Sequence, residues 1–236
     1  MYDNNDLIYY LLYNYSYFIL VVPMLIFSLI ASAKVKSAFN KYSSVYSMRG
    51  LTGAQAAQEI LKYYEINNVV IERVAGDLTD HYDPKTNAIR LSDNVYNSTS
   101  VAAIGVACHE AGHAAQYANG YFPVKLRSVI YPACSIGSKA GIPLAILGII
   151  LGFSLLVDIG IVLFTLAVFF QIVTLPVEFN ASGRAVKVIE QTGVLSQDEL
   201  KGAKKVLTAA ALTYVASLAV SVANLLRLLI LRNRRK

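Results

Sequence analysis

Two histidines four residues apart flank a glutamate in the run His109-Glu110-Ala111-Gly112-His113. Residues four apart lie on one face of an α-helix, one turn from each other, so both imidazoles can reach one metal ion. Zinc accepts imidazole nitrogens at about 2.0–2.1 Å. The glutamate beside the first histidine is placed to act on a water that the metal activates. The motif therefore predicts a zinc site with Glu110 as the general base.

A catalytic zinc usually has three protein ligands and one water, so the chain must supply a third ligand. The candidates are His81, which is the only other histidine, and Glu178, which follows the uncharged stretch 159–177. An ionised carboxylate at the edge of such a stretch is costly unless it is paired, and zinc would pair it. The competing explanation is a carboxylate that faces water or pairs with Arg184. We expect Glu178, because a carboxylate from a second helix commonly completes this motif.

The segment that carries the motif is predicted to be helical on independent grounds. Ser98-Thr99-Ser100 supplies capping hydroxyls for a helix from about 101 to 119, and Gly120 follows its end. Apolar side chains recur at helical spacing within it, at Val101, Ile104, Ala107 and Ala111. This is the helical context that the two histidines require.

A helix, a strand and a hairpin precede the motif helix. Thr52 and Gln55 form a capping box for a helix that we expect to end near residues 67–68, and residues 69–71 read as a strand. Residues 80–91 read as a hairpin, with turn-forming residues at 84–87. We expect its second strand, 88–91, to pair with an extended substrate by strand addition.

Long uncharged stretches indicate a membrane protein. The chain has 236 residues, of which 56% are hydrophobic, and the uncharged stretches are 7–33, 141–157, 159–177 and 206–226. A transmembrane helix needs about 20 apolar residues. One helix over 141–177 would be roughly 55 Å long, too long for one crossing, so we expect a tight turn at 157–160. The first stretch follows an acidic start without Lys or Arg, which favours an uncleaved anchor over a signal peptide.

The basic residues indicate orientation rather than nucleic-acid binding. The net charge is +6, and Lys and Arg flank the apolar stretches at Lys34, Lys36 and Lys41 and at Lys125, Arg127 and Lys139. Such flanks are typical of cytoplasmic loops, so we expect the catalytic unit on the cytoplasmic side. The basic tail 232–236 fits this orientation only if the last stretch does not cross, and both possibilities stay open. The two cysteines, Cys108 and Cys134, have no metal or redox spacing and read as buried free thiols.

Three segments resemble a known family. They are 78–116, LTDHYDPKTNAIRLSDNVYNSTSVAAIGVACHEAGHAAQ; 175–185, LPVEFNASGRA; and 207–216, LTAAALTYVA. They resemble the neutral zinc metallopeptidases of bacterial membranes, the YugP-like family, and are more distantly similar to the HtpX and CAAX-prenyl-protease group of gluzincins. The resemblance implies a zinc peptidase with the two motif histidines and Glu178 as ligands.

One position departs from the distant group. There, an aspartate follows the ligand glutamate by four residues and supports a ligand from behind, whereas this chain has Ser182. Asn180 and Ser182 are the candidates to replace that contact. A peptidase also needs a group to stabilise the oxyanion, and His81, Tyr82 and Arg184 are the candidates for oxyanion or substrate contacts.

Together these features predict an α+β membrane protein, mainly helical, with about four transmembrane or membrane-associated helices and a small zincin-like catalytic unit. That unit would contain a short β-hairpin and the motif helix. We expect five segments: an N-terminal transmembrane anchor at 1–33, the catalytic unit at 34–130, a transmembrane hairpin at 131–177, a third-ligand helix and connection at 178–205, and a C-terminal membrane helix with a basic tail at 206–236.

The predicted function is a membrane-anchored, zinc-dependent endopeptidase of the gluzincin type. A zinc-activated water would attack the peptide carbonyl, and Glu110 would take its proton and deliver it to the leaving amine. We expect one zinc ion per chain, a multi-pass location in the cell membrane, and a peptide or membrane-protein substrate. An inactive zinc-binding membrane scaffold is the alternative. A transporter is disfavoured, because Asp158 is the only acid within 141–177.

Overall fold

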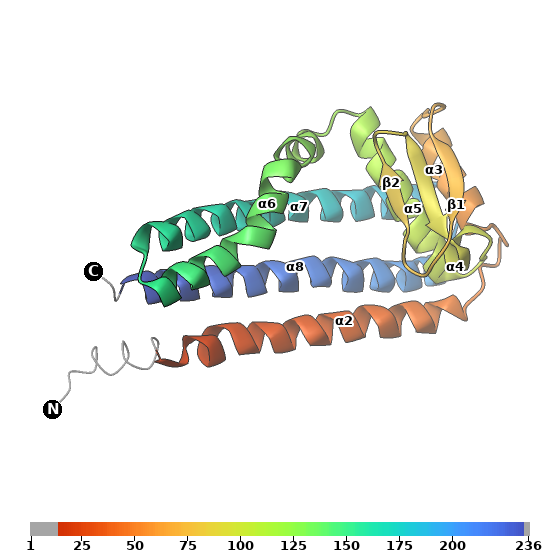
Figure 1. Ribbon diagram of the computed structural model, residues 1–236. Helices are drawn as coiled ribbons and strands as arrows, with labels where there is room; N and C mark the ends of the chain where they lie inside the picture. The colour runs from red at the N-terminus through yellow and green to blue at the C-terminus, as the bar shows by residue number, and fades with distance from the viewer. Residues whose placement is uncertain (1–13, 234–236) are drawn as a thin grey trace. The chain divides into compact units, whose positions relative to one another are not determined.

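The computed structural model describes residues 14–233, so the start of the first apolar stretch and the last three residues lie outside it. The chain forms two compact units. Within the described residues, unit 1 contains 14–31, 126–174 and 213–233, and unit 2 contains 32–125 and 175–212. Long helices supply unit 1, whereas unit 2 combines helices with a small sheet, as Figure 1 shows. The expected α+β membrane fold is confirmed, while the five-segment division stays a prediction.

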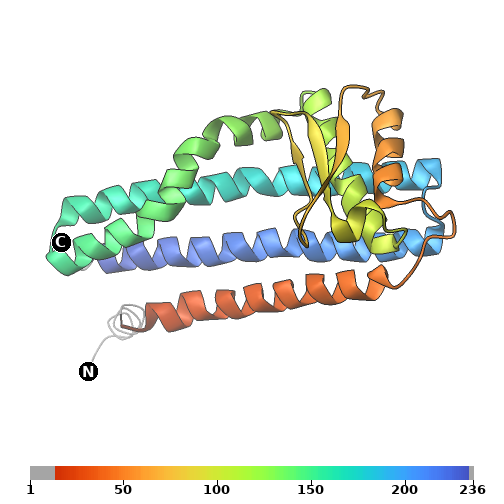
Figure 2. The same cartoon turned by 45° about the vertical axis from the view of Figure 1, so that its right-hand side comes forward.

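Unit 1 is built from segments of four long helices. A short π-helical turn, η1 (Tyr17–Val21), leads into α2 (Val22–Ser43), and the others are α6 (Phe122–Leu151), α7 (Ser154–Thr192) and α8 (Gln197–Asn233). Within residues 14–233, these four are the helices long and apolar enough to cross a membrane. Figures 1 and 2 both show α7 and α8 running antiparallel in this unit. The last apolar stretch is therefore helical over a length that permits a crossing.

The turn between α6 and α7 lies earlier than the sequence suggested. We expected it at 157–160, but α6 ends at Leu151 and α7 begins at Ser154. Gly152 has φ +72° and the Phe153 N–H donates to the Gly148 carbonyl, which closes the end of α6. Gly160 instead lies within α7, where an added Cβ would meet the Ala145 nitrogen at 2.5 Å. The lack of a side chain at Gly160 therefore allows close helix packing and does not form a turn.

Unit 2 contains a three-stranded sheet with the order β1-β3-β2. The strands are β1 (Val70–Val74), β2 (His81–Asp83) and β3 (Ala88–Ser92). β2 and β3 are antiparallel with Tyr82 opposite Ile89, which confirms the hairpin, and β1 joins β3 in parallel. β3 is thus central, so the expectation that residues 88–91 pair with substrate is wrong. Both of its edges are occupied, and β2 is the strand with an open edge near α5.

Three helices complete unit 2: α3 (Gly53–Tyr63), α4 (Asp93–Tyr96) and α5 (Val101–Ala118). The predicted capping box of α3 is present, with Thr52 and Gln55 bonded reciprocally, although the helix ends at Tyr63, short of residues 67–68. After α3, the chain changes direction at Glu65, which has φ +57°.

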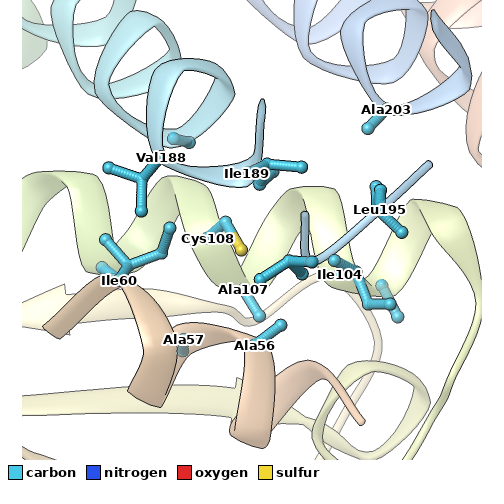
Figure 3. Packing of buried hydrophobic residues seen from close by; sticks show 14 of the residues in the cluster. Ala56, Ala57, Ile60, Ile104, Ala107, Cys108, Val188, Ile189, Leu195 and Ala203 are labelled. Carbon is cyan, nitrogen blue, oxygen red and sulfur yellow. The ribbon is translucent and has the colours of Figure 1, made fainter. Parts of the chain in front are cut away.

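The core of unit 2 surrounds α5. Figure 3 shows Ala57 and Ile60 of α3 on one side of α5 and Val188 and Ile189 of α7 on the other. All four side chains are fully buried, as is Cys108 of α5 itself. Small residues along α5 allow close approach on both sides, so α5 is held between α3 and α7. Both cysteines are buried free thiols, as expected.

Candidate active site

The motif helix α5 has well-formed ends. The Ser100 hydroxyl accepts a hydrogen bond from the Ala103 N–H at 3.2 Å, and Gly120 follows the helix with φ +64°. These are the cap and the stop that the sequence predicts. His109 and His113 therefore lie on one face in the second half of α5, with ring centroids 4.7 Å apart.

The Glu178 carboxylate meets the two imidazoles. The Glu178 Oε2 atom lies 3.3 Å from His109 Nε2 and 3.6 Å from His113 Nε2. One ligand atom from each of the three residues lies within 4.8 Å of the other two. Tetrahedral zinc with bonds near 2.0–2.1 Å separates its ligand atoms by about 3.3 Å. The nitrogen–nitrogen–oxygen set and its spacing fit a zinc ion, and these residues would hold it.

The triad is buried on the carboxylate side and more open on the histidine side. The Glu178 side chain is 3% exposed, whereas the His109 and His113 side chains are 16% and 13% exposed. Burial of the His113 imidazole opposes protonation, but the contacts with Glu178, Glu110 and Gln116 outweigh it and raise the pKa of His113. A buried anion surrounded by imidazoles is the electrostatic setting that a divalent cation prefers.

Helices α5 and α7 come unusually close at this point. An added Cβ at Gly112 would lie 2.5 Å from the Ala181 carbonyl oxygen. Gly112 directly precedes His113 on α5, and Ala181 lies one turn after Glu178 on α7. The absence of a side chain at Gly112 therefore allows the carboxylate helix to reach the histidine helix.

Each imidazole is also held from behind through its Nδ1 atom. His109 Nδ1 lies 3.0 Å from the Ser182 hydroxyl, and His113 Nδ1 lies 3.1 Å from Gln116 Oε1. Such contacts orient the rings so that both Nε2 atoms point at Glu178. Asn180 reaches the histidines only indirectly, by accepting a hydrogen bond from Gln116 Nε2 at 3.0 Å.

Glu110 is fixed by the open edge of the sheet. Its Oε2 atom accepts a hydrogen bond from the Tyr82 N–H at 3.0 Å, and the residue is 9% exposed. Tyr82 lies at the centre of β2, so this N–H points away from β3 and toward α5. The carboxylate is thereby held beside the two histidines of its own helix.

The side chains of the three remaining candidates from the sequence make their contacts outside the triad. His81 is exposed, and its Nδ1 bonds the Thr79 carbonyl. Because side chains alternate along a strand, His81 and Tyr82 point to opposite faces of the sheet. The Tyr82 hydroxyl donates to Asn87, so only its backbone touches Glu110. Arg184 donates to Asn180, and its guanidinium lies over the rings of Tyr64 and Tyr121.

Gln116 is the contact that the sequence reasoning missed. It follows His113 by three residues, so the two share a helix face, and that spacing is the signal that could have found it. The sequence does not show that its amide is turned toward the imidazole, because that depends on partners from α7.

Comparison with known proteins gives the family. The family model described as "Putative neutral zinc metallopeptidase" matches residues 17–233. The chain belongs to this zinc metallopeptidase family. A curated relative, "Putative membrane protease YugP" of Bacillus subtilis (strain 168), is 47% identical over 208 residues, which cover 88% of this chain and 92% of that protein. No solved structure matches. The resemblance noted from the sequence is confirmed, and this metallopeptidase has a group of residues on α5 and α7, His109, His113 and Glu178, that could hold a metal ion.

Proposed function

We propose that this metallopeptidase is a membrane-anchored endopeptidase of the gluzincin type, with one zinc ion per chain. His109, His113 and Glu178 would bind the metal, and Glu110 would be the general base. The observation that carries the proposal is the distance of 3.3–3.6 Å from Glu178 Oε2 to both imidazole Nε2 atoms. These three residues come from two helices far apart in the sequence, and their donor atoms match zinc chemistry.

When bound, zinc supplies a Lewis acid that acidifies a water molecule and polarises the scissile carbonyl. Glu110 takes the proton from the attacking water and later delivers it to the leaving amine. The Tyr82 N–H holds Glu110 Oε2, which leaves Oε1 as the oxygen for proton transfer. The limited exposure of Glu110 strengthens its interactions by excluding bulk water.

The open edge of β2 is the proposed site for the substrate backbone. In this short strand, His81 and Asp83 bond toward β3, and Tyr82 directs its polar backbone groups outward. The Tyr82 carbonyl is on the edge where a substrate strand would add, beside Glu110. An extended peptide there would run past the base.

The proposed location is a multi-pass position in the cell membrane with the catalytic unit on the cytoplasmic side. Four apolar helices and the membrane-protease relative support the membrane part. The basic residues at 34–41 and 125–127 support the cytoplasmic side. The substrate would then be a peptide or a membrane protein with a segment reachable from the cytoplasm.

The test uses the full chain purified in detergent. Glu110→Gln should keep its zinc, measured by mass spectrometry of the metal content, and lose cleavage of a quenched fluorescent peptide library by roughly 10²-fold or more. Glu190→Gln, an exposed glutamate on α7, is the matched control and should cleave normally. Cleavage by Glu110→Gln equal to that of the parent would end the catalytic proposal and favour the inactive scaffold. Removal of zinc with a chelator should abolish cleavage, and added zinc should restore it.

A further inference from the structure

A buried amide lies directly behind one of the proposed metal ligands. Gln116 is 0% exposed, and its side chain makes three hydrogen bonds. Its Oε1 faces His113 Nδ1 at 3.1 Å, and its Nε2 donates to the Val177 carbonyl at 2.7 Å and to Asn180 Oδ1 at 3.0 Å. Gln116 thus bridges α5, which carries the histidines, and the turn of α7 that carries Glu178.

The hydrogen-bond partners on α7 determine which end of the Gln116 amide is the oxygen and which is the NH₂ group. Arg184 Nε can only donate, and it donates to Asn180 Oδ1 at 2.8 Å, so this oxygen must be an acceptor. The Val177 carbonyl can also only accept. Both groups therefore demand the NH₂ end of Gln116, which leaves Oε1 to face the imidazole. With the amide reversed, the Gln116 oxygen would face two acceptor oxygens, the Val177 carbonyl and Asn180 Oδ1.

The fixed amide in turn selects one form of the imidazole. Because Gln116 Oε1 only accepts, His113 Nδ1 must carry a proton, which leaves Nε2, 3.6 Å from the Glu178 carboxylate, as the ring nitrogen that can bind a metal. We infer that Gln116 is a positioning residue of the metal centre: it holds His113 in the metal-binding tautomer, and Asn180 and Arg184 impose its orientation.

This inference rests on the proposed zinc site but assigns new roles within it. Arg184, a candidate for substrate contact on sequence grounds, becomes the end of the chain Arg184–Asn180–Gln116–His113. The other histidine ligand, His109, has a different kind of partner at its Nδ1 atom. His109 Nδ1 meets the Ser182 hydroxyl, which can donate or accept, so its tautomer is not imposed in the same way.

The experiment measures zinc affinity of the full chain in detergent by competition with a chromophoric chelator. Gln116→Met keeps the shape and removes both polar ends, and it should weaken zinc binding roughly 10–100-fold. Asn180→Asp keeps an acceptor for both Arg184 and Gln116, and it should bind zinc no more weakly than the parent. Asn180→Leu removes that acceptor, and it should fall between Gln116→Met and the parent because Val177 still orients the amide.

Two controls separate positioning from stability. Ile189→Ala opens a cavity in the same core without touching the network, and Gln191→Met makes the same chemical change at an exposed position of α7. Melting of the metal-free proteins, followed by circular dichroism, identifies variants of equal stability. Zinc affinity should fall for Gln116→Met and not for Ile189→Ala at a temperature where both are folded. Equal affinity in these two variants would overturn the inference.

His113→Ala distinguishes the two levels of failure. If it loses zinc while Gln116→Met binds normally, the positioning role is wrong and the metal site stands. If His113→Ala itself binds zinc as the parent does, the metal site and the inference fall together.

Discussion

At the scale of single residues, the site is defined by which atom of each side chain faces which neighbour. The two imidazoles point their Nε2 atoms at one carboxylate oxygen because Ser182 and Gln116 hold their Nδ1 atoms. The contact behind His109 comes from a neutral hydroxyl, so the orientation of His109 is held less firmly than an ionised carboxylate would hold it.

The role of Ser182 can be tested by substitution in both directions. Ser182→Ala removes the partner of His109 and should weaken zinc binding by about 10-fold or more, and Ser182→Asp should strengthen it, because an ionised carboxylate only accepts and enforces a protonated Nδ1. Chelator competition measures both changes. A Ser182→Ala variant with the affinity of the parent would show that the hydroxyl does not orient His109.

Cys108 neighbours His109 in sequence but belongs to the core. Burial raises the pKa of its thiol, so at every pH below that pKa its thiolate fraction is smaller than that of an ordinary cysteine. In a Cys134→Ser background, N-ethylmaleimide at pH 8 should leave Cys108 unmodified in the folded protein and label it fully after denaturation. Mass spectrometry of the intact protein gives the count, and rapid labelling of the folded protein would contradict the burial.

At the scale of elements, the site depends on the distance between α5 and α7. The two helices touch through the backbone at Gly112 and Ala181, so the histidines and Glu178 reach one another without long side chains. The sequence shows Gly112 only as a middle residue of the motif. Its packing role is seen only in the structure, where the Ala181 carbonyl oxygen lies 2.5 Å from the position that a Cβ on Gly112 would take.

A pair of glycine substitutions tests this approach. Gly112→Ala should push α7 away and destabilise the protein by roughly 1–3 kcal/mol, as overpacking does, and it should also weaken zinc binding. Gly183→Ala, on α7 itself, meets no atom within 4 Å and should raise the helix stability by up to about 1 kcal/mol. Melting temperature and zinc affinity are measured for both. A harmless Gly112→Ala would show that the helices have room to separate.

At the scale of the whole molecule, the four long helices place the chain in the membrane. In unit 1, Arg232 near the end of α8 pairs with Asp158 near the start of α7, and the Arg227 guanidinium lies over the Tyr17 ring at 5.1 Å. The start of the first helix, the turn between α6 and α7, and the end of α8 therefore share one end of unit 1. The pair also offsets one positive charge at the end of α8.

This arrangement predicts the topology. If all four helices cross, cysteines introduced at Phe153, in the turn between α6 and α7, and at Met48, in unit 2, should lie on opposite sides of the membrane. Both positions are exposed, at 58% and 88%. In a chain without native cysteines, a membrane-impermeant maleimide applied to intact cells should label Phe153→Cys and not Met48→Cys. Labelling of both from outside would exclude the cytoplasmic location of the catalytic unit.

The sequence by itself determined the features that depend on neighbours a few residues away. The spacing of His109 and His113, the caps at Thr52 and Ser100, and the hairpin all follow from local geometry, because a helix repeats every 3.6 residues and a strand every two. The apolar stretches are equally local, since a crossing is a matter of length and composition.

The tertiary structure decided the features that depend on distant segments. The meeting of Glu178 with the histidines, the orientation of Gln116 and the central place of β3 each require packing between parts of the chain that are far apart in sequence. The misplaced turn has the same cause, because Gly160 resembles a turn residue until Ala145 is found against it. Side-chain polarity and close packing act between residues that are close in space, whereas a sequence pattern reports only on residues that are close along the chain.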